Sequence, residues 1–183
     1  MVYNKLVVFD FDGTLVDTGG DINKYKIIYK EKTGSDWKGS WWDNPKSLDY
    51  YMFNFKRIES TFELYSKFII EPNTITVMLT GRKTRLSKEV KKVLKKLGIN
   101  KFNHYLYNYG ENTLSNKKEQ VLTLIDMYPT VEELIMYDDR ENHIKPFNEF
   151  GESLIKMKSN KIKKSSIYQV TNGKIVNTTN TYI

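Results

Sequence analysis

The sequence predicts an α/β domain with a mostly parallel central sheet and helices layered on it. Short apolar runs typical of buried parallel strands recur along the chain. Between them lie segments whose apolar residues repeat at helical spacing. Strands that alternate with helices form layered α/β domains. The length of 183 residues suits one such domain with a core of its own.

Four apolar runs are the candidate strands. The first is KLVVFD over residues 5–10, and the second is ITVML over residues 75–79. The third is LIMY over residues 134–137, and a weaker fourth is expected over residues 154–157. The first three are bounded by polar residues, as is typical of strands that are buried on both faces of a sheet.

Two helices are predicted between these strands. Over residues 86–97 the apolar residues lie at helical spacing, and Gly98 follows as a C-cap. Over residues 118–128, Val121, Leu122 and Ile125 share one face. Pro129 ends this second helix, because proline cannot continue the backbone hydrogen bonds.

Two stretches depart from the alternation of strands and helices. Residues 19–73 are rich in aromatic residues and have helical patterns over 25–29 and 52–68, so we expect a small helical, lid-like insertion. After residue 158 the chain is polar, and segments 167–170 and 174–176 flank Asn172-Gly173, a strong hairpin signal. We therefore expect a core domain over residues 1–158 that carries the insertion, and a C-terminal β-hairpin over residues 159–183 packed on it.

The composition excludes several classes of protein. The chain contains no cysteine, which excludes a disulfide scaffold and a thiolate zinc site and agrees with a cytoplasmic location. No apolar run approaches the roughly 20 residues of a membrane span, so no membrane partner is expected. The net charge of +7 fits an anionic partner such as nucleic acid. All but four basic residues are lysine, however, which fits a compositional bias of the genome equally well. The sequence carries no signal for an oligomeric state.

Two aspartates follow the first candidate strand. In extended backbone the side chains of Asp10 and Asp12 would face the same side. Two carboxylates that converge there require a cation between them or a proton on one of them. Mg²⁺ prefers such oxygen ligands. The crevice beyond the carboxyl ends of parallel strands is also where open α/β sheets bind ligands.

The next two candidate strands end in groups of related chemistry. Thr80-Gly81-Arg82 offers a hydroxyl and backbone amides that can cradle an anion. Asp138-Asp139 again places carboxylates at a strand end. Each motif alone is commonly an ordinary turn or helix cap. Three of them in succession point to one site.

In this order the motifs resemble those of the haloacid dehalogenase (HAD) superfamily of phosphohydrolases. The resemblance spans most of residues 2–147 and implies a Rossmann-like three-layer fold and a Mg²⁺-dependent phosphatase that forms an aspartyl-phosphate. Further residues are similar to the Swiss Army Knife RNA repair-like branch of that superfamily. They are the segment 79–82, Thr113, Tyr128-Pro129, the segment 137–140 with His143 and Phe147, and the segment 41–45 with Leu48.

The resemblance assigns roles to the acidic residues. Asp10 would be the nucleophile, and Asp12 the general acid and base. Mg²⁺ would be held by Asp10, by the backbone carbonyl of Asp12 and by Asp139, with Asp138 in support.

The resemblance also implies a phosphate-binding set. Thr80 and Gly81 would bind the phosphoryl oxygens, and Arg82 would either join them or pair with an aspartate. A lysine would neutralise the nucleophile and the phosphoryl group. Counting from the preceding threonine favours Lys117, whereas the apolar face of the helix favours Lys118, and we expect Lys118.

The remaining candidates concern the substrate. Arg140, His143, Trp41 and Trp42 are candidate substrate contacts, with a structural hydrogen bond as the alternative for His143 and internal packing as the alternative for the tryptophans. We expect the substrate to be a nucleic-acid end or a nucleotide phosphate. One alternative is a small-molecule phosphomonoesterase, acting for example on sugar phosphates. Another is a non-catalytic module that binds nucleic acid or a partner.

Overall fold

A computed structural model of the chain describes residues 2–18, 20–110 and 112–182, with side chains described up to residue 176. Met1, Gly19 and Ile183, which bound three of the predicted ranges, lie outside the described residues. None of the helices in the described ranges combines the length and the apolar character that a membrane crossing needs.

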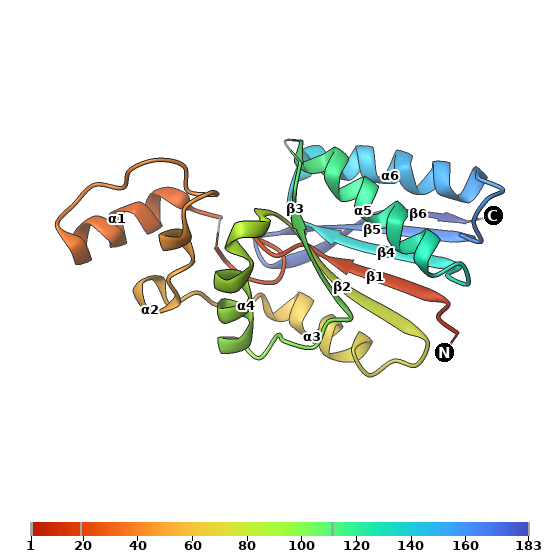
Figure 1. Cartoon of the computed structure of the whole chain (residues 1–183), viewed down its shortest axis with the longest axis horizontal. Coiled ribbons are helices and arrows are strands. Elements are labelled where there is room, and N and C mark those ends of the chain that lie inside the picture. The colour runs from red at the N-terminus through yellow and green to blue at the C-terminus, as the bar shows by residue number, and fades with distance from the viewer. Residues whose placement is uncertain (1, 19, 111, 183) are drawn as a thin grey trace.

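The central sheet has the strand order β3-β2-β1-β4-β5-β6 within the described residues (Figure 1). The first five strands are parallel, and β6 is antiparallel to β5. The chain leaves β1 toward β2 and β3 on one side and later returns toward β4 and β5 on the other. This makes β1 the point where open α/β sheets bind ligands. The bounds are Lys5–Phe9 (β1), Thr74–Lys83 (β2), His104–Asn108 (β3), Glu133–Asp138 (β4), Lys164–Thr171 (β5) and Lys174–Tyr182 (β6).

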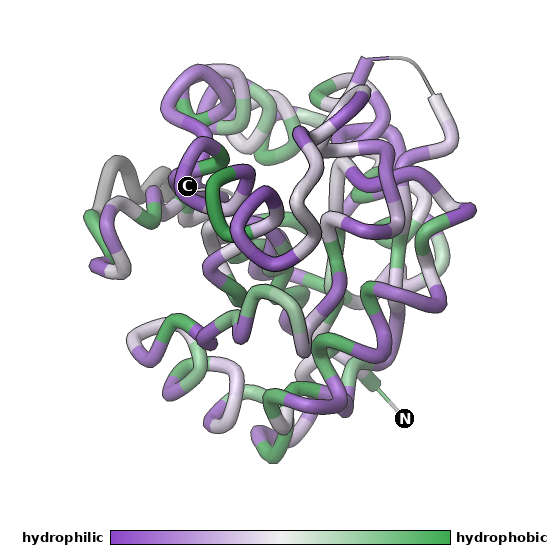
Figure 2. The backbone as a smooth tube through the Cα atoms, turned by 90° about the vertical axis from the view of Figure 1, so that its left-hand side faces the viewer, coloured by the Kyte–Doolittle hydropathy of each residue, from purple (hydrophilic) through white to green (hydrophobic). Residues whose placement is uncertain are grey.

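Helices cover both faces of the sheet. Helices α3 (Glu59–Phe68) and α4 (Ser87–Lys96) lie on one face, and α5 (Thr113–Met127) and α6 (Glu141–Lys156) lie on the other (Figure 1). Hydrophobic and hydrophilic residues alternate along these helices, as expected where one side faces a sheet (Figure 2). The predicted three-layer α/β class is therefore confirmed.

Strand β1 shows why the strand sequences are almost continuously apolar. Leu6 and Val8 belong to the hydrophobic cluster that includes residues of α5 and α6. Val7 and Phe9 belong to the cluster that includes residues of α3 and α4. Because successive side chains point to opposite faces and both faces are covered, every buried position of the strand, from Leu6 to Phe9, is apolar.

Two strand assignments differ from the sequence prediction. Residues 154–157 form the end of α6 and its C-cap rather than a strand. A short apolar run cannot be distinguished from a buried helical segment by periodicity alone, and Leu154 is buried on the face of α6. Strand β3 was not predicted, because it lies at the edge of the sheet and only the last two of its five residues are buried.

The predicted insertion divides into two parts. Helix α1 (Ile22–Thr33), the 3₁₀ turn η1 (Pro45–Leu48) and the short helix α2 (Tyr50–Phe53) project beyond the sheet (Figure 1). Helix α3 instead belongs to a helical layer of the core. The helical pattern over residues 52–68 is thus interrupted, and Asn54 ends α2 in a left-handed conformation with φ of 50°.

Two adjacent chain segments join the projecting part to the core. The Asp17 N–H donates to the Lys56 carbonyl over 2.9 Å, and the Ile58 N–H donates to the Leu15 carbonyl over 3.0 Å. An isolated bridge between Val16 and Arg57 lies between these bonds. The insertion therefore leaves and re-enters the core at one place.

The C-terminal hairpin is confirmed. Asn172 and Gly173 connect β5 to β6 with φ values of 50° and 73°, as a two-residue turn between twisted strands requires. Strand β5 also pairs in parallel with β4 from Lys164 to Gln169. The hairpin therefore extends the central sheet.

The close approach of α6 to β5 depends on Gly151. A Cβ atom at this position would lie 2.1 Å from Ser165 Oγ. We expect Gly151→Ala to lower the free energy of unfolding by about 1–3 kcal/mol, because the helix must move away from the sheet. Urea denaturation measures the change. Ser153→Ala, at an exposed position of the same helix, is the control and should change stability by less than about 1 kcal/mol. Equal stability of Gly151→Ala and the wild type would contradict the packing described here.

Candidate active site

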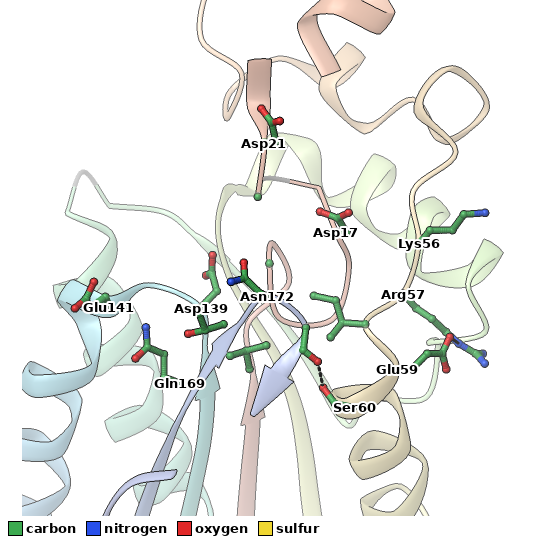
Figure 3. A pocket seen from close by; sticks show the side chains of 16 residues that line it. Asp17, Asp21, Lys56, Arg57, Glu59, Ser60, Asp139, Glu141, Gln169 and Asn172 are labelled. Atoms are coloured by element: carbon green, nitrogen blue, oxygen red, sulfur yellow. Dashed lines mark hydrogen bonds and ion pairs between the residues drawn. The ribbon is translucent and has the colours of Figure 1, made fainter. Parts of the chain in front are cut away.

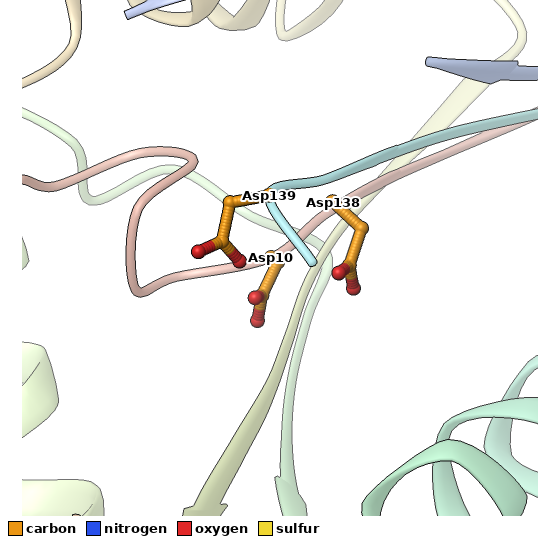
Figure 4. A group of neighbouring side chains, drawn as sticks. All are labelled: Asp10, Asp138 and Asp139. Atoms are coloured by element: carbon orange, nitrogen blue, oxygen red, sulfur yellow. The ribbon is translucent and has the colours of Figure 1, made fainter. Parts of the chain in front are cut away.

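Three carboxylates meet at the ends of two paired strands (Figure 4). Asp10 follows β1 directly, Asp138 is the last residue of β4, and Asp139 follows it. One oxygen from each lies within 4.8 Å of those from the other two. Asp10 and Asp139 thus lie close together, as the sequence predicts. The acids converge because β1 and β4 are parallel and in register, so that both strands end at the same edge.

Lys117 of α5 lies between two of these acids. Its Nζ is 2.9 Å from Asp10 Oδ1 and 2.6 Å from Asp138 Oδ2. The Lys117 side chain is only 3% exposed. In contrast, Lys118 Nζ lies 5.8 Å from the centre of the Phe150 ring and does not reach the acids. The expectation that Lys118 faces the site is therefore wrong.

The phase of α5 explains this correction. Lys117 lies one helical turn before the buried Val121, on a face that also includes Asn116 and Gln120. Helix α5 begins at Thr113, five residues earlier than the sequence pattern indicated. A prediction from the apolar residues alone therefore put Lys118, instead of Lys117, near the buried face of the helix.

The charges of this group perturb one another strongly. Burial raises the pKa of Asp10 to about 6, although Lys117 opposes the change. Burial would lower the pKa of Lys117, but the charges of Asp10 and Asp138 outweigh it and raise that pKa above its ordinary value. Burial would raise the pKa of Asp138, yet Lys117 and His143 lower it to about 2. Lys117 therefore remains an ammonium ion between carboxylates.

Asp138 is fully engaged by protein groups. Besides Lys117, its Oδ1 accepts the Arg140 N–H over 3.0 Å and lies 3.3 Å from His143 Nδ1. His143 is 4% exposed and packs edge-on against Phe147 at 5.6 Å between ring centres. The candidate role of His143 as a substrate contact is contradicted, because the ring is buried behind Asp138. The alternative of a structural contact describes it correctly.

Asp139 has the opposite environment. Burial, together with the charges of Asp10 and Asp138, raises its pKa to about 8. A carboxylate that is disfavoured in this way gains most from a bound cation. Three converging carboxylates offer the oxygen ligands that a hard divalent ion such as Mg²⁺ prefers. Of the three, Asp138 is already engaged by Lys117 and by the Arg140 N–H.

We expect Asp139→Asn to flatten the pH dependence of stability in protein treated with EDTA. The raised pKa of Asp139 gives a contribution to folding that is complete below pH 3.8 and is lost as the pH rises through about 8. The thermal midpoint of the wild type should therefore fall more between about pH 6 and about pH 9 than that of the variant. Excess Mg²⁺ should raise the midpoint of the wild type at the higher pH and leave the variant unchanged. Asp126→Asn, at an exposed position, is the control and should behave as the wild type. An equal response to Mg²⁺ in both variants would contradict the assignment.

Arg82 pairs with Asp12 rather than facing the substrate. Its Nη2 donates to Asp12 Oδ1 over 2.8 Å and its Nε donates to Asp12 Oδ2 over 3.0 Å. The guanidinium group is 1% exposed. The phosphate-binding role of Arg82 is thus contradicted, and its alternative role as a partner of an aspartate is confirmed. Thr18, which the sequence analysis missed, donates to Asp12 Oδ1 over 2.6 Å.

Arg82 also ties the insertion to the site. Its Nη1 donates to the carbonyls of Trp41 and Trp42, each over 3.1 Å, and to Ser47 Oγ over 2.8 Å. One buried side chain therefore sets the position of the insertion relative to Asp12. Neither Thr18 nor Ser47 carries a signal in the sequence, since both reach the site only through this folded arrangement.

The two candidate tryptophans have different surroundings. Trp41 is buried and stacks on Tyr25 with ring centres 5.5 Å apart, so its predicted contact with substrate is contradicted by packing inside the insertion. Trp42 is 36% exposed. The guanidinium carbons of Arg82 and Arg140 lie 4.9 Å and 5.9 Å from its ring centre.

Trp42 and Arg140 border a cavity of about 580 Å³ beside the acids. Gly81 lies in its wall, in agreement with a phosphate-binding position, whereas the hydroxyl of Thr80 is buried and accepts the Arg82 N–H over 3.1 Å. This cavity, hereafter the site cavity, is lined by Asp12, Trp42, Asp43, Gly81, Lys83, Asn108, Thr113, Asp139 and Arg140.

A second cavity of about 790 Å³ lies on the other side of Asp139, next to the β5–β6 turn (Figure 3). Its labelled acids, Asp17, Asp21, Glu59, Asp139 and Glu141, outnumber its two basic residues, Lys56 and Arg57. An anionic substrate is therefore favoured in the site cavity, where Asp12 and Asp43 are each paired with an arginine.

Comparison with known proteins gives two kinds of match. A family model described as HAD domain family 1 in Swiss Army Knife RNA repair proteins matches residues 25–179. The matched span includes the ends of β2 and β4 and Lys117, whereas Asp10 and Asp12 lie before it. A curated relative, the uncharacterized protein YMR265C of Saccharomyces cerevisiae, is 27% identical over an alignment that covers 82% of this chain. This chain spans only 37% of that relative's length.

Solved structures share the fold. A haloacid dehalogenase-like hydrolase from Streptococcus pneumoniae is 16% identical, with 81% of each chain covered and a TM-score of 0.52. A candidate phosphatase from Clostridium difficile is 19% identical, with 82% of this chain and 83% of that chain covered and a TM-score of 0.53.

Proposed function

Because this chain belongs to HAD domain family 1 of Swiss Army Knife RNA repair proteins, we propose that it is a phosphohydrolase that uses Asp10 as its nucleophile. The observation that carries the proposal is the position of the Asp10 carboxylate. It lies at the switch point of the sheet, 2.9 Å from the Lys117 ammonium and beside the carboxyl group of Asp139. Such a carboxylate is held in place by Lys117 and lies next to Asp139, which lines the site cavity.

In the first step, a carboxylate oxygen of Asp10 forms a bond to phosphorus. The bond between phosphorus and the leaving oxygen breaks, and its electron pair remains on that oxygen, which takes a proton from Asp12. The product is an aspartyl-phosphate and a free alcohol. Lys117 and the Gly81 N–H would stabilise the charge on the nucleophile and the phosphoryl oxygens.

In the second step, Asp12 accepts a proton from water as the water oxygen forms a bond to phosphorus. The bond between phosphorus and the Asp10 oxygen breaks, which releases inorganic phosphate and restores the Asp10 carboxylate. The pairing with Arg82 and Thr18 keeps the Asp12 carboxylate in one orientation at the wall of the site cavity. The two steps together consume one water molecule.

Asp10 and Asp139 would hold Mg²⁺, with the backbone carbonyl of Asp12 as a further ligand. The ion would supply positive charge that binds the phosphoryl group and offsets the repulsion among the acids. Asp138 has a different role. Its carboxylate contacts Lys117 and accepts the Arg140 N–H, and so it holds the lysine in position.

For the substrate we propose the phosphorylated end of a nucleic acid, or a nucleotide phosphate. Three observations support this class: the net charge of +7, the partly exposed Trp42 in the wall of the site cavity, and Arg140 beside that ring. An indole can stack on a nucleobase and an arginine can bind a phosphate. A small phosphate ester is the second candidate. A cytoplasmic location and activity as a purely binding module stay predictions of the sequence, and the intact acidic site disfavours the latter.

Phosphate release from 3′- and 5′-phosphorylated oligoribonucleotides, compared with a panel of small phosphate esters in Mg²⁺ and in EDTA, tests the proposal. We expect Mg²⁺-dependent release that is fastest from an oligonucleotide end. Turnover of small esters alone would reject the nucleic-acid class, and absence of any release would reject the phosphohydrolase.

Trp42→Ala is expected to raise the KM for a phosphorylated oligonucleotide about tenfold, because one stacked base is lost. The KM for p-nitrophenyl phosphate should change little, since that ester has no neighbouring nucleotide. Trp42→Phe, which keeps an aromatic face, is the matched control. Equal effects of Trp42→Ala on both substrates would show that Trp42 does not contact a base.

A further inference from the structure

We propose that a groove between the insertion and α4 binds single-stranded nucleic acid that continues from the reacting end. The inference rests on the proposed function and names a second contact region for its substrate. The groove has a volume of about 940 Å³ and is separate from the site cavity. It is lined by Pro45, Lys46, Leu48, Asp49, Tyr50 and Tyr51 of the insertion and by Glu89, Lys92, Lys95 and Lys96 of α4.

The α4 side of the groove carries a strong positive charge. The sequence of the helix is SKEVKKVLKK, and its buried residues are Val90, Val93 and Leu94. With these on the core side, all five lysines of the helix are exposed, and Lys92, Lys95 and Lys96 line the groove. Lysines that follow one another along a helix face neutralise the successive phosphates of a nucleic-acid backbone.

Two acidic residues in the lining do not cancel this charge. Asp49 is the N-cap of α2, and its Oδ1 accepts the Met52 N–H over 3.0 Å. Glu89 lies in the first turn of α4, where the helix dipole favours a negative charge. Both acids thus have a role in local structure, and the four lysines of the lining, Lys46, Lys92, Lys95 and Lys96, outnumber them.

The insertion side of the groove presents an aromatic ring to solvent. Tyr51 is 75% exposed, and its ring centre lies 5.8 Å from that of Tyr50 and 5.1 Å from Lys96 Nζ. Packing in the hydrophobic core does not explain Tyr51, because most of its side chain is exposed. An exposed ring beside lysines is the combination that binds single strands, in which unpaired bases stack and the backbone phosphates pair with the ammonium groups.

One short chain segment borders both the site cavity and the groove. Trp42 and Asp43 line the site cavity, while Pro45, Lys46 and Leu48, which follow at once in the chain, line the groove. Asp43 is paired with Arg85, just before α4, so the same segment is fixed to the helix. A strand that stacks its terminal base on Trp42 can therefore pass over this segment into the groove.

The chemistry of the groove favours a single strand over other polyanions. A duplex encloses the faces of its bases, so Tyr51 could not stack on them. An acidic peptide would satisfy the lysines but would offer no planar base to the exposed ring. A variant without the Tyr51 ring and a variant without the lysine charges therefore distinguish a single strand from an acidic peptide.

Fluorescence anisotropy with a labelled, unphosphorylated single-stranded RNA of about ten nucleotides tests the groove. We expect Tyr51→Ala to weaken binding about tenfold and Tyr51→Phe to restore it. The double variant Lys92→Gln/Lys96→Gln should make the slope of log affinity against log salt shallower by about 1.4. Lys145→Gln/Lys156→Gln, which removes two exposed lysines of α6 on the opposite face of the sheet, is the matched control and should bind as the wild type.

Hydrolysis of p-nitrophenyl phosphate and the thermal midpoint of each variant show whether the fold and the site remain intact. Binding that is equal in the wild type, Tyr51→Ala and the Lys92/Lys96 variant would overturn the groove, even if phosphate release is observed. Loss of binding in the lysine variant alone, with Tyr51→Ala unchanged, would indicate a polyanion surface without base stacking and would also overturn it. Binding through the groove without any phosphate release would retain the groove and reject the phosphohydrolase.

Discussion

Asp10→Asn is expected to reduce Mg²⁺-dependent phosphate release by on the order of 10⁴-fold or more, with the fold retained. The amide has the size of the carboxylate but does not attack phosphorus, so the covalent step is lost. The fold should tolerate the change, because burial already disfavours the charged form of Asp10 and raises its pKa to about 6. Lys117 keeps Asp138 as its partner at 2.6 Å. Phosphate release and the thermal midpoint, both measured in Mg²⁺, check the two parts of this expectation.

Asp126→Asn is the matched control for the same chemical change at an exposed position of α5. It should retain the turnover of the wild type. Undiminished turnover by Asp10→Asn would reject Asp10 as the nucleophile. The cluster of acids would then serve only to bind an ion.

Lys117→Met is expected to lower both stability and activity. The substitution leaves the buried carboxylates of Asp10 and Asp138 without their cation, and loss of one partner of a buried pair typically costs about 3–5 kcal/mol. Turnover should fall as well, because the charge beside the nucleophile is gone. Urea denaturation measures the first effect, and phosphate release by the folded fraction measures the second.

Lys118→Met provides the comparison at the adjacent residue. Lys118 lies against the Phe150 ring and makes no contact with the acids, so this variant should match the wild type in turnover. If Lys118→Met reduced turnover and Lys117→Met did not, Lys118 rather than Lys117 would be the lysine of the site.

The sequence predicts the acids of the site well because their positions depend on strand ends. A buried parallel strand is recognisable from its apolar run, and the side chains that follow Phe9 and Tyr137 must then lie at the same edge of the sheet. For this reason the strand ends predict that Asp10 lies near the pair Asp138-Asp139, whereas the choice of Asp139 as the metal ligand depends on the family resemblance. The hairpin at Asn172 and Gly173 was predictable for a similar reason, since the turn requires its own residue types.

Residues that depend on helix phase or on the insertion could not be placed in this way. The choice between Lys117 and Lys118 required the true start of α5, and a change of one position rotates a side chain by about 100°. The Arg82 side chain that pairs with Asp12 is also held by three acceptors of the insertion. No local pattern predicts such a contact between distant segments.

The edge and the interior of the sheet also differ in how well they can be predicted. Strand β3 has polar and aromatic residues that suit a half-covered edge, so its sequence lacks a strong strand pattern. Within residues 154–157, Leu154 and Ile155 are apolar because the last turn of α6 packs on the core. In both cases tertiary position, rather than intrinsic preference, decides the structure.

The most direct test of this account is to trap the phosphorylated residue. The enzyme is mixed with substrate and Mg²⁺, quenched in acid and reduced with borohydride, which converts an aspartyl-phosphate to homoserine, and peptide mass spectrometry then locates the altered residue. We predict homoserine at position 10, in wild-type protein with Mg²⁺ and not after treatment with EDTA. Phosphate release without modification at position 10, or modification of a different residue, would contradict the claim that Asp10 attacks the phosphoryl group.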